Sequence, residues 1–149
     1  MNPSWRIGQL AERVGVTPRT IRYYEEVGLM VAPARSSGGT RRYGDADLAR
    51  LMRIRELQAV MGFNLEEIRE LLAAGDRLED LRIEYRAGAT PGRTAAIVSE
   101  AIALNARTQE QVLAKIAVLQ AYQHELQADG KRYRAFARRH GVDVSTRNV

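Results

Sequence analysis

Cysteine is absent from this sequence of 149 residues, and histidine occurs only twice, as His124 and His140. The lack of cysteine excludes disulfides, thiolate-bound metals and iron–sulfur clusters held by cysteine. Two histidines argue against a histidine metal site. We therefore expect neither a bound metal nor another cofactor.

Long apolar runs are also missing. No stretch approaches the roughly 20 residues that span a bilayer, and residues 1–10 lack the apolar core of a signal peptide. We therefore expect a cytoplasmic protein. Because no Ser/His/Asp set, carboxylate pair or phosphate-binding loop stands out, we do not expect an enzyme.

Charge is abundant and unevenly placed. Residues 1–43 hold seven arginines and three acidic residues, a net charge of +4. Residues 44–130 have a net charge of −4, and residues 131–149 a net charge of +5. A solvated surface explains part of this pattern, but a basic N-terminal part also suits a polyanionic partner.

Two short helices are predicted near the N-terminus. Apolar residues at i, i+3, i+4 and i+7 predict a first helix that ends at Gly15, namely Ile7, Leu10, Ala11 and Val14. Thr17 can cap a second helix, with Pro18 at its first position. About three residues then separate the helices, which is the spacing of a helix-turn-helix.

The second helix has two different faces. At about 100° per residue, one side carries Thr20, Ile21, Tyr24 and Val27, and the other carries Arg19, Arg22, Tyr23 and Glu26. The first side can pack on the first helix. Outward arginines and a tyrosine suit a helix that lies in the major groove of DNA. The alternative is an ordinary solvated face with an Arg22–Glu26 pair.

Residues 29–43 read as a β-hairpin, because an apolar start, a Ser-Ser-Gly-Gly turn and a basic return follow one another. A basic hairpin after a recognition helix is typical of a wing, with Arg35, Arg41 and Arg42 near its tip and phosphates as the expected contact. The alternative is a loop with chance arginines.

Two more helices should complete this core. Asp45 is expected to cap a helix that runs to Met61 and buries four residues, Leu48, Leu51, Met52 and Leu57. Asn64 and Glu67 have capping-box spacing before a helix that Gly75 should end.

The three stretches IGQLAERVGVTPRTIRYYEEVGL, GGTRRY and DLARLMRIRELQAVMGFNLEEIRELL resemble the N-terminal domain of the MerR family of bacterial transcription regulators. The resemblance covers residues 6 to about 74. It implies a homodimer with two recognition helices in successive major grooves and wings on the flanking backbone. It further implies that the protein bends and untwists a promoter so that RNA polymerase can engage it, which is recognition through DNA shape.

The resemblance assigns DNA contacts to Arg19, Tyr23 and the wing residue Arg41, with Thr17 and Tyr24 as phosphate contacts. Thr40 replaces the aromatic residue that is usual before the wing arginine. With the residues chosen above, the predicted DNA-binding set is Thr17, Arg19, Thr20, Arg22, Tyr23, Tyr24, Arg35, Arg41, Arg42 and Tyr43.

The C-terminal half is expected to form the dimer. Thr90 and Pro91 predict the start of a helix with no strong breaker before Gly130. A seam in steps of three and four fits an antiparallel coiled coil, with a monomeric helical hairpin as the alternative. The seam residues are Val98, Ile102, Asn105, Gln109, Val112, Ile116, Leu119, Gln123 and Leu126.

The sequence therefore predicts a mainly α protein, with a winged helix-turn-helix DNA-binding domain (1–75) followed by a long antiparallel coiled-coil dimerisation helix (91–129). Residues 76–90 should be a connecting segment with a short helix. Residues 130–149 should form a basic tail with a short helix, which could dock on the partner's DNA-binding domain or contact phosphates.

The signal that such a regulator would sense is less defined. Without cysteine, the metal-sensing and redox-sensing branches of the family are excluded, which leaves an organic effector or none. Aromatic residues that could line an effector pocket are Tyr85, Tyr122, Tyr133, Phe136 and Trp5, although each also suits an ordinary core. An effector-independent repressor and a coiled-coil adaptor that does not bind DNA are the alternative functions.

Overall fold

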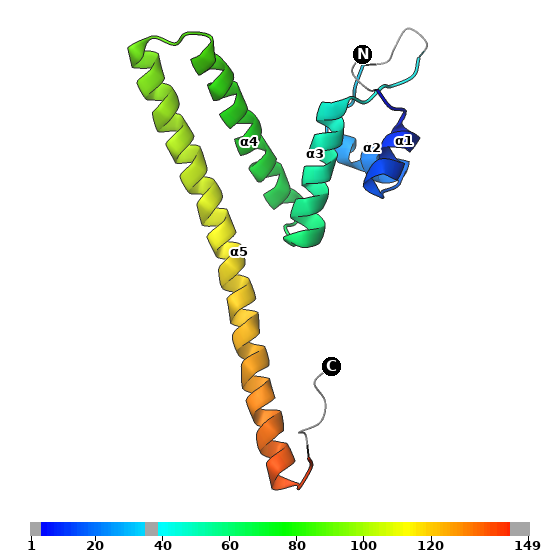
Figure 1. Cartoon of the computed structure of the whole chain (residues 1–149), viewed down its shortest axis with the longest axis vertical. Coiled ribbons are helices and arrows are strands. Elements are labelled where there is room, and N and C mark those ends of the chain that lie inside the picture. The colour runs from blue at the N-terminus through cyan, green and yellow to red at the C-terminus, as the bar shows by residue number, and fades with distance from the viewer. Residues whose placement is uncertain (1–3, 35–38, 144–149) are drawn as a thin grey trace. The chain divides into compact units, whose positions relative to one another are not determined.

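The computed structural model describes residues 4–34 and 39–143, and it is mainly helical, as predicted (Figure 1). The helices are α1 (Ile7–Val14), α2 (Pro18–Glu26), α3 (Asp45–Arg55), α4 (Leu65–Arg86) and α5 (Pro91–Arg139), with a π-helical turn η1 (Glu56–Val60) after α3. The chain divides into two units, residues 1–105 and 106–149, and α5 runs through both.

The turn between α1 and α2 follows from three local signals. Gly15 ends α1 in the left-handed conformation, with φ 69° and ψ 41°, which glycine adopts without a steric penalty. The hydroxyl of Thr17 accepts a hydrogen bond of 3.1 Å from the backbone N–H of Thr20, and Pro18 occupies the first helical position. The predicted helix-turn-helix is therefore confirmed.

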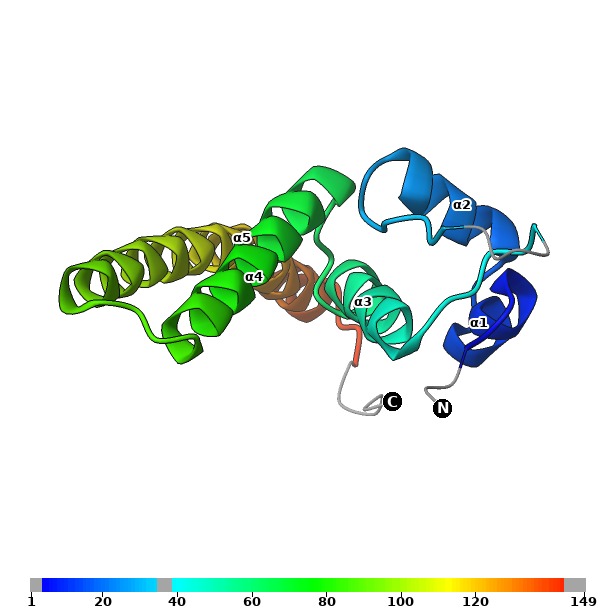
Figure 2. The same cartoon turned by 90° about the horizontal axis from the view of Figure 1, so that it is seen from above.

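One apolar core joins the N-terminal helices, and α1, α2 and α3 gather around it (Figure 2). Leu10 of α1, Ile21 of α2 and Leu51 of α3 are fully buried, and burying each such side chain stabilises the fold by roughly 1.5–3 kcal/mol. The other buried members are Trp5, Ala11, Val14, Tyr24, Leu29, Met30, Tyr43, Ile54, Leu57, Phe63, Ile68 and Leu72.

Three arginine side chains bind carbonyl groups at the ends of the first two helices. Arg55 of α3 donates to the carbonyl oxygens of Val14 and Gly15 at the end of α1. Arg69 of α4 donates to the carbonyl oxygen of Val27, just after α2, at 2.9 Å. The last carbonyls of a helix lack intrahelical partners, so these guanidinium groups satisfy them and complement the negative helix ends.

Arg50 of α3 makes the third contact of this kind. Its Nε donates to the carbonyl oxygen of Leu29, which follows α2, at 2.5 Å. Its Nη1 lies 2.8 Å from both carboxylate oxygens of Asp76 on α4. Arg50 therefore connects the exit of α2 with α4.

The start of α3 and its buried face differ from our prediction. Gly44, not Asp45, is the N-cap residue, and its N–H donates to the carboxylate of Asp47 at 2.7 Å. Regular helix ends at Arg55 instead of Met61, because the π-helical turn follows. Met52 is exposed, at 57%, since it points about 100° away from the core-facing Leu51.

The capping box of α4 is confirmed, but its predicted end is wrong. Asn64 and Glu67 exchange hydrogen bonds of 2.7 and 2.9 Å. The helix continues through Gly75 to Arg86, so residues 76–86 belong to α4 and form no separate short helix. A helical glycine costs only about 1 kcal/mol relative to alanine, and the burial of Leu81 further along α4 offsets that cost.

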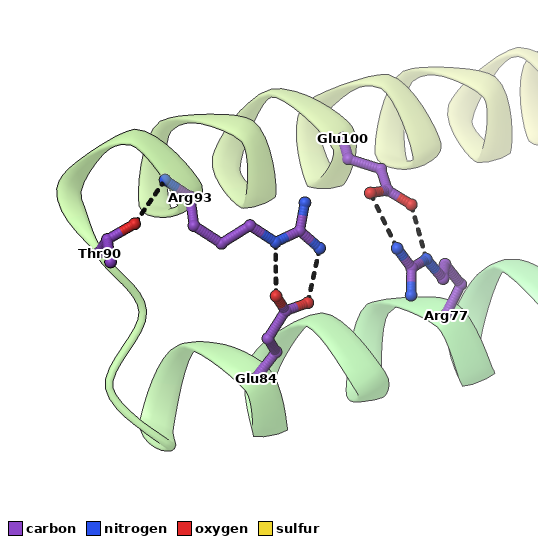
Figure 3. A network of polar contacts seen from close by, with 5 residues as sticks. All are labelled: Arg77, Glu84, Thr90, Arg93 and Glu100. Carbon is purple, nitrogen blue, oxygen red and sulfur yellow. Dashed lines mark hydrogen bonds and ion pairs between the residues drawn. The ribbon is translucent and has the colours of Figure 1, made fainter.

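Two ion pairs join α4 to the first turns of α5 (Figure 3). Arg77 of α4 donates to both oxygens of Glu100 on α5, at 2.6 and 3.0 Å. Arg93 of α5 donates to both oxygens of Glu84 on α4, with one distance of 2.6 Å. Because the two pairs have opposite polarity, a shift of α5 along α4 would bring like charges together.

The hydrogen bonds in these pairs also affect titration. Arg93 lowers the pKa of Glu84, and Arg77 lowers the pKa of Glu100. Both carboxylates therefore hold their negative charge to lower pH than an unpaired glutamate.

The predicted start of α5 is confirmed, with Thr90 accepting from the N–H of Arg93 at 3.3 Å and Pro91 as the first helical residue.

Helix α5 contains 49 residues, which corresponds to a length of about 74 Å at 1.5 Å per residue. We expected a break at Gly130, but the helix continues to Arg139. Good helix formers on both sides of Gly130 make one glycine too weak a breaker. The apolar seam residues Val98, Ile102 and Ile116 are exposed in the single chain, at 50%, 64% and 42%.

Candidate nucleic-acid interface

Helix α2 presents the two faces that the sequence predicts. Ile21 and Tyr24 point into the core and are 0% and 4% exposed. Arg19, Arg22 and Tyr23 lie on the outward side and are exposed, Tyr23 at 45%. The second helix of the helix-turn-helix thus offers two guanidinium groups and one phenol to a partner.

The hydroxyl groups at the start of α2 contact each other. Thr17 Oγ1 and Thr20 Oγ1 are 2.9 Å apart, in addition to the cap that Thr17 provides. The two threonines therefore define the first turn of α2. Both stay predicted DNA-contacting residues.

Tyr24 and Tyr43, two of the predicted DNA-binding residues, have buried side chains. The Tyr24 hydroxyl donates to Gln58 at 2.8 Å, and the Tyr43 hydroxyl donates to Glu25 at 2.8 Å. Burial raises the pKa of Tyr24, and burial together with the hydrogen bond to Glu25 raises the pKa of Tyr43 to about 12. Both phenols therefore stay protonated and act as donors inside the domain.

The segment expected to form the wing is described in part, and its described residues, 29–34 and 39–43, contain no β-strand, so the predicted β-hairpin is not seen in them. Tyr43 pairs with Trp5 in an antiparallel bridge, with two backbone hydrogen bonds of 2.8 and 3.0 Å. Arg35 and the rest of the expected tip, residues 35–38, lie outside the described residues. Arg42 is exposed.

Arg41 has one side-chain nitrogen paired inside the protein. Its Nη1 lies 3.1 Å from the carboxylate of Glu25 on α2, and the Arg41 side chain is 40% exposed. This pair holds the end of the wing segment against α2. Sequence reasoning missed Glu25, because no local pattern relates residues 16 positions apart.

A hollow of about 340 Å³ lies between the start of α1, helix α2 and the wing segment. Three arginines contribute to its wall, Arg6, Arg22 and Arg41. Guanidinium groups bind phosphate well because they donate several hydrogen bonds in one plane. Arg6 was not among the predicted DNA-binding residues, since its position before the first helix carries no motif.

The candidate effector residues are not brought into the core. Tyr85, Tyr122, Tyr133 and Phe136 are each more than half exposed. Phe136 stacks on His140 with ring centres 4.2 Å apart, and the exposed aromatic residues stay candidates for an effector contact.

Trp5 is different, since it is buried and the guanidinium of Arg13 lies 5.0 Å from its ring centre.

Within residues 4–34 and 39–143, no group of three or more acidic, histidine or cysteine side chains could hold a metal ion. No helix in that part of the chain is long and apolar enough to cross a membrane.

An arginine-bearing second helix behind a capped turn is the helix-turn-helix fold of DNA-binding proteins. The model of the family described as MerR HTH family regulatory protein matches residues 5–75. The chain is 41% identical over 123 residues to the HTH-type transcriptional regulator ZntR of Escherichia coli (strain K12), covering 83% of this chain and 76% of ZntR. The chain belongs to the MerR family of transcription regulators, as its sequence motifs indicate.

A shorter match and a solved structure agree with this assignment. The chain is 42% identical over 74 residues to the HTH-type transcriptional regulator YfmP of Bacillus subtilis (strain 168), covering 50% of this chain and 53% of YfmP, so it spans about half the length of that relative. The fold is similar to that of HiNmlR, a MerR family regulator lacking the sensor domain, solved bound to promoter DNA. The TM-score is 0.53 at 23% identity, over 93% of this chain and 92% of that one.

Proposed function

We propose that this protein binds a pseudo-palindromic promoter operator as a homodimer and regulates transcription there. The observation that carries the proposal is the outward face of α2, where Arg19, Arg22 and Tyr23 are exposed while Ile21 and Tyr24 fix the helix to the core. Arginine can donate two hydrogen bonds to the O6 and N7 atoms of guanine. The face therefore combines direct base contacts with phosphate contacts.

The wing segment supplies a second contact to the backbone. Arg42 is exposed, and the hollow of about 340 Å³ lined by Arg6, Arg22 and Arg41 carries the positive charge that a phosphate would need. Contacts to phosphate fix the position of the protein along the duplex and make affinity fall with salt.

Helix α5 supports a dimer. Its seam from Val98 to Leu126 carries apolar side chains that are exposed in the single chain, in the alternating steps of three and four that a coiled coil needs. An antiparallel pairing of two such helices gives the protein two recognition helices. A two-fold protein then reads a two-fold DNA site.

Two recognition helices on one duplex allow the dimer to change the shape of the promoter, so that RNA polymerase engages both promoter elements. An organic effector would control this change, and the exposed aromatic residues of α4 and α5, such as Tyr85 and Tyr122, are its candidate contacts. The second candidate function is effector-independent repression. A coiled-coil adaptor is favoured only by the exposed seam and leaves the arginine face of α2 without a role.

The test is binding to the DNA upstream of the protein's own coding region, measured across a salt series beside a scrambled duplex. Arg19→Ala should weaken operator binding by roughly 1–3 kcal/mol if Arg19 contacts a base, with the dimer unchanged by sedimentation. The matched control is Arg82→Ala, since Arg82 is an exposed arginine on α4, outside the interface. Unchanged operator affinity for Arg19→Ala would remove Arg19 from the recognition surface.

The wild-type result separates the functions. Sequence-dependent binding that protects a palindrome supports the operator-binding function, and the same complex then allows organic ligands to be screened for release or distortion of the DNA. A dimer without affinity for any genomic fragment would favour the adaptor.

A further inference from the structure

Glu25 is a carboxylate on α2 that faces the wing segment and not the outward recognition surface. Its side chain is 8% exposed. One carboxylate oxygen accepts a hydrogen bond of 3.1 Å from Arg41 Nη1, and the other accepts a hydrogen bond of 2.8 Å from the Tyr43 hydroxyl. Both donors come from the short segment that returns from the wing.

These contacts compensate a costly burial. A carboxylate removed from water is strongly destabilising unless it is paired and hydrogen-bonded. Each oxygen of Glu25 has one donor, and the Tyr43 ring and backbone are fixed in turn by the core and by the bridge to Trp5. The carboxylate is therefore held in one place with respect to the wing segment.

The contact also restricts Arg41, which is a predicted DNA-binding residue. Its Nη1 is directed to Glu25, and its Nε is buried without a hydrogen-bond partner among the described residues. Arg41 also lines the hollow to which Arg6 and Arg22 contribute. The direction in which Arg41 presents its charge therefore depends on Glu25.

We propose that Glu25 is a positioning residue for DNA recognition, which orients Arg41 and the return of the wing against α2. The inference rests on the proposed operator binding and adds a residue that does not touch the DNA. By its charge alone, a carboxylate near the DNA repels phosphate. A favourable contribution of Glu25 to recognition must therefore come through the position of Arg41 and the wing segment. Glu25 fixes the angle between two elements that must contact the same duplex.

This role predicts a separation between specific and non-specific binding. Non-specific binding depends on net charge and tolerates changes in orientation. Specific binding requires the arginines of α2 and the wing to meet the duplex in one register. Removing Glu25 should therefore weaken operator binding while leaving binding to scrambled DNA unchanged or slightly stronger.

The experiment uses the full chain and compares Glu25→Ala with Glu79→Ala, which removes the same charge from an exposed position on α4, outside the interface. For each variant, the dissociation constants for operator and scrambled duplexes and the melting temperature are measured. Glu25→Ala should lower the ratio of specific to non-specific affinity about tenfold, as expected for the loss of one or two hydrogen-bond contacts. Glu79→Ala should change both affinities by the same factor and keep the ratio.

Each other result overturns the positioning role. Equal ratios for the two variants would show that Glu25 acts only through its charge. A fall in melting temperature with parallel loss of both affinities would show a purely structural role. Wild-type protein with no preference for the operator would overturn the proposed function as well, so the wild-type ratio distinguishes that failure from the failure of this inference.

Tyr43→Phe is the second variant, and it decides the matter if Glu25→Ala does not fold. It removes only the hydroxyl that donates to Glu25 and keeps the buried ring. The specificity ratio should fall in the same direction but by a smaller factor, since the Arg41 contact is kept. An unchanged ratio in a folded Tyr43→Phe protein would contradict the proposal.

Discussion

The adjacent tyrosines of α2 allow stability and DNA binding to be separated by removing one oxygen atom at a time. Tyr24 is 4% exposed, and its hydroxyl donates to Gln58 of the π-helical turn at 2.8 Å. Tyr23 is 45% exposed on the outward face. Tyr24→Phe should therefore lower the free energy of unfolding, whereas Tyr23→Phe should weaken operator binding.

The expected size follows from the surroundings of Gln58. A neutral hydrogen bond contributes a net of about 0.5–1.5 kcal/mol, and an orphaned buried partner raises the loss further. Gln58 is exposed, so its carbonyl oxygen can turn to water when the phenol is removed. We therefore expect Tyr24→Phe to cost about 1 kcal/mol, which lowers the melting temperature by about 4 °C for a chain of this length.

The assay is urea unfolding of wild type, Tyr24→Phe and Tyr23→Phe, beside operator binding by each. All three are measured at one protein concentration, because the stability of a dimer depends on concentration. Tyr23→Phe should unfold within about 0.5 kcal/mol of wild type. An unchanged unfolding free energy for Tyr24→Phe, or a larger loss of operator affinity for it than for Tyr23→Phe, would refute the assignment of the two faces.

Three further predictions concern the helices. Asn64→Ala removes the cap of α4 and should cost about 1 kcal/mol of unfolding free energy by urea titration, and no loss would contradict the capping box. Ile116→Asp places a charge in the exposed seam of α5 and should convert the dimer to monomers by sedimentation, while a persisting dimer would exclude this seam. Because the pKa values of Glu84 and Glu100 are lowered, their ion pairs stabilise the packing of α4 on the start of α5 at pH values above the ordinary glutamate pKa. That stability should be lost as pH falls through the lowered values, so replacing both by glutamine should flatten this part of the acid melting curve.

Most signals that act over a few residues were read correctly from the sequence, although Gly44 and not Asp45 is the N-cap of α3. Gly15, Thr17 with Pro18, and the Asn64–Glu67 box each determine a helix end through contacts within about four residues. The orientation of α2 also followed from its pattern, because Ile21 and Tyr24 lie on one side of the helix and Arg19, Arg22 and Tyr23 on the other. The resemblance carried by these motifs was sufficient to identify the family.

Signals that depend on tertiary contacts were misread. Gly75 and Gly130 were expected to end helices, but a preference of about 1 kcal/mol is outweighed by packing and by good neighbours. Met52 was expected to be buried because it is apolar, yet the core lies along Leu51 and Ile54. Of the interface residues, Arg6 and Glu25 were not predicted. The burial of Glu25 depends on donors that reach it from the segment after the wing.

The guanidinium contacts to Val14, Val27 and Leu29 have a consequence for how the N-terminal domain opens. They make the first two helices dependent on residues that follow them, since the donors belong to α3 and α4. A fragment ending at Gly44 would lose all three donors together with the packing of α3. Helix α2 should therefore exchange its amide hydrogens only when the whole domain unfolds, as one cooperative unit and not by local fraying.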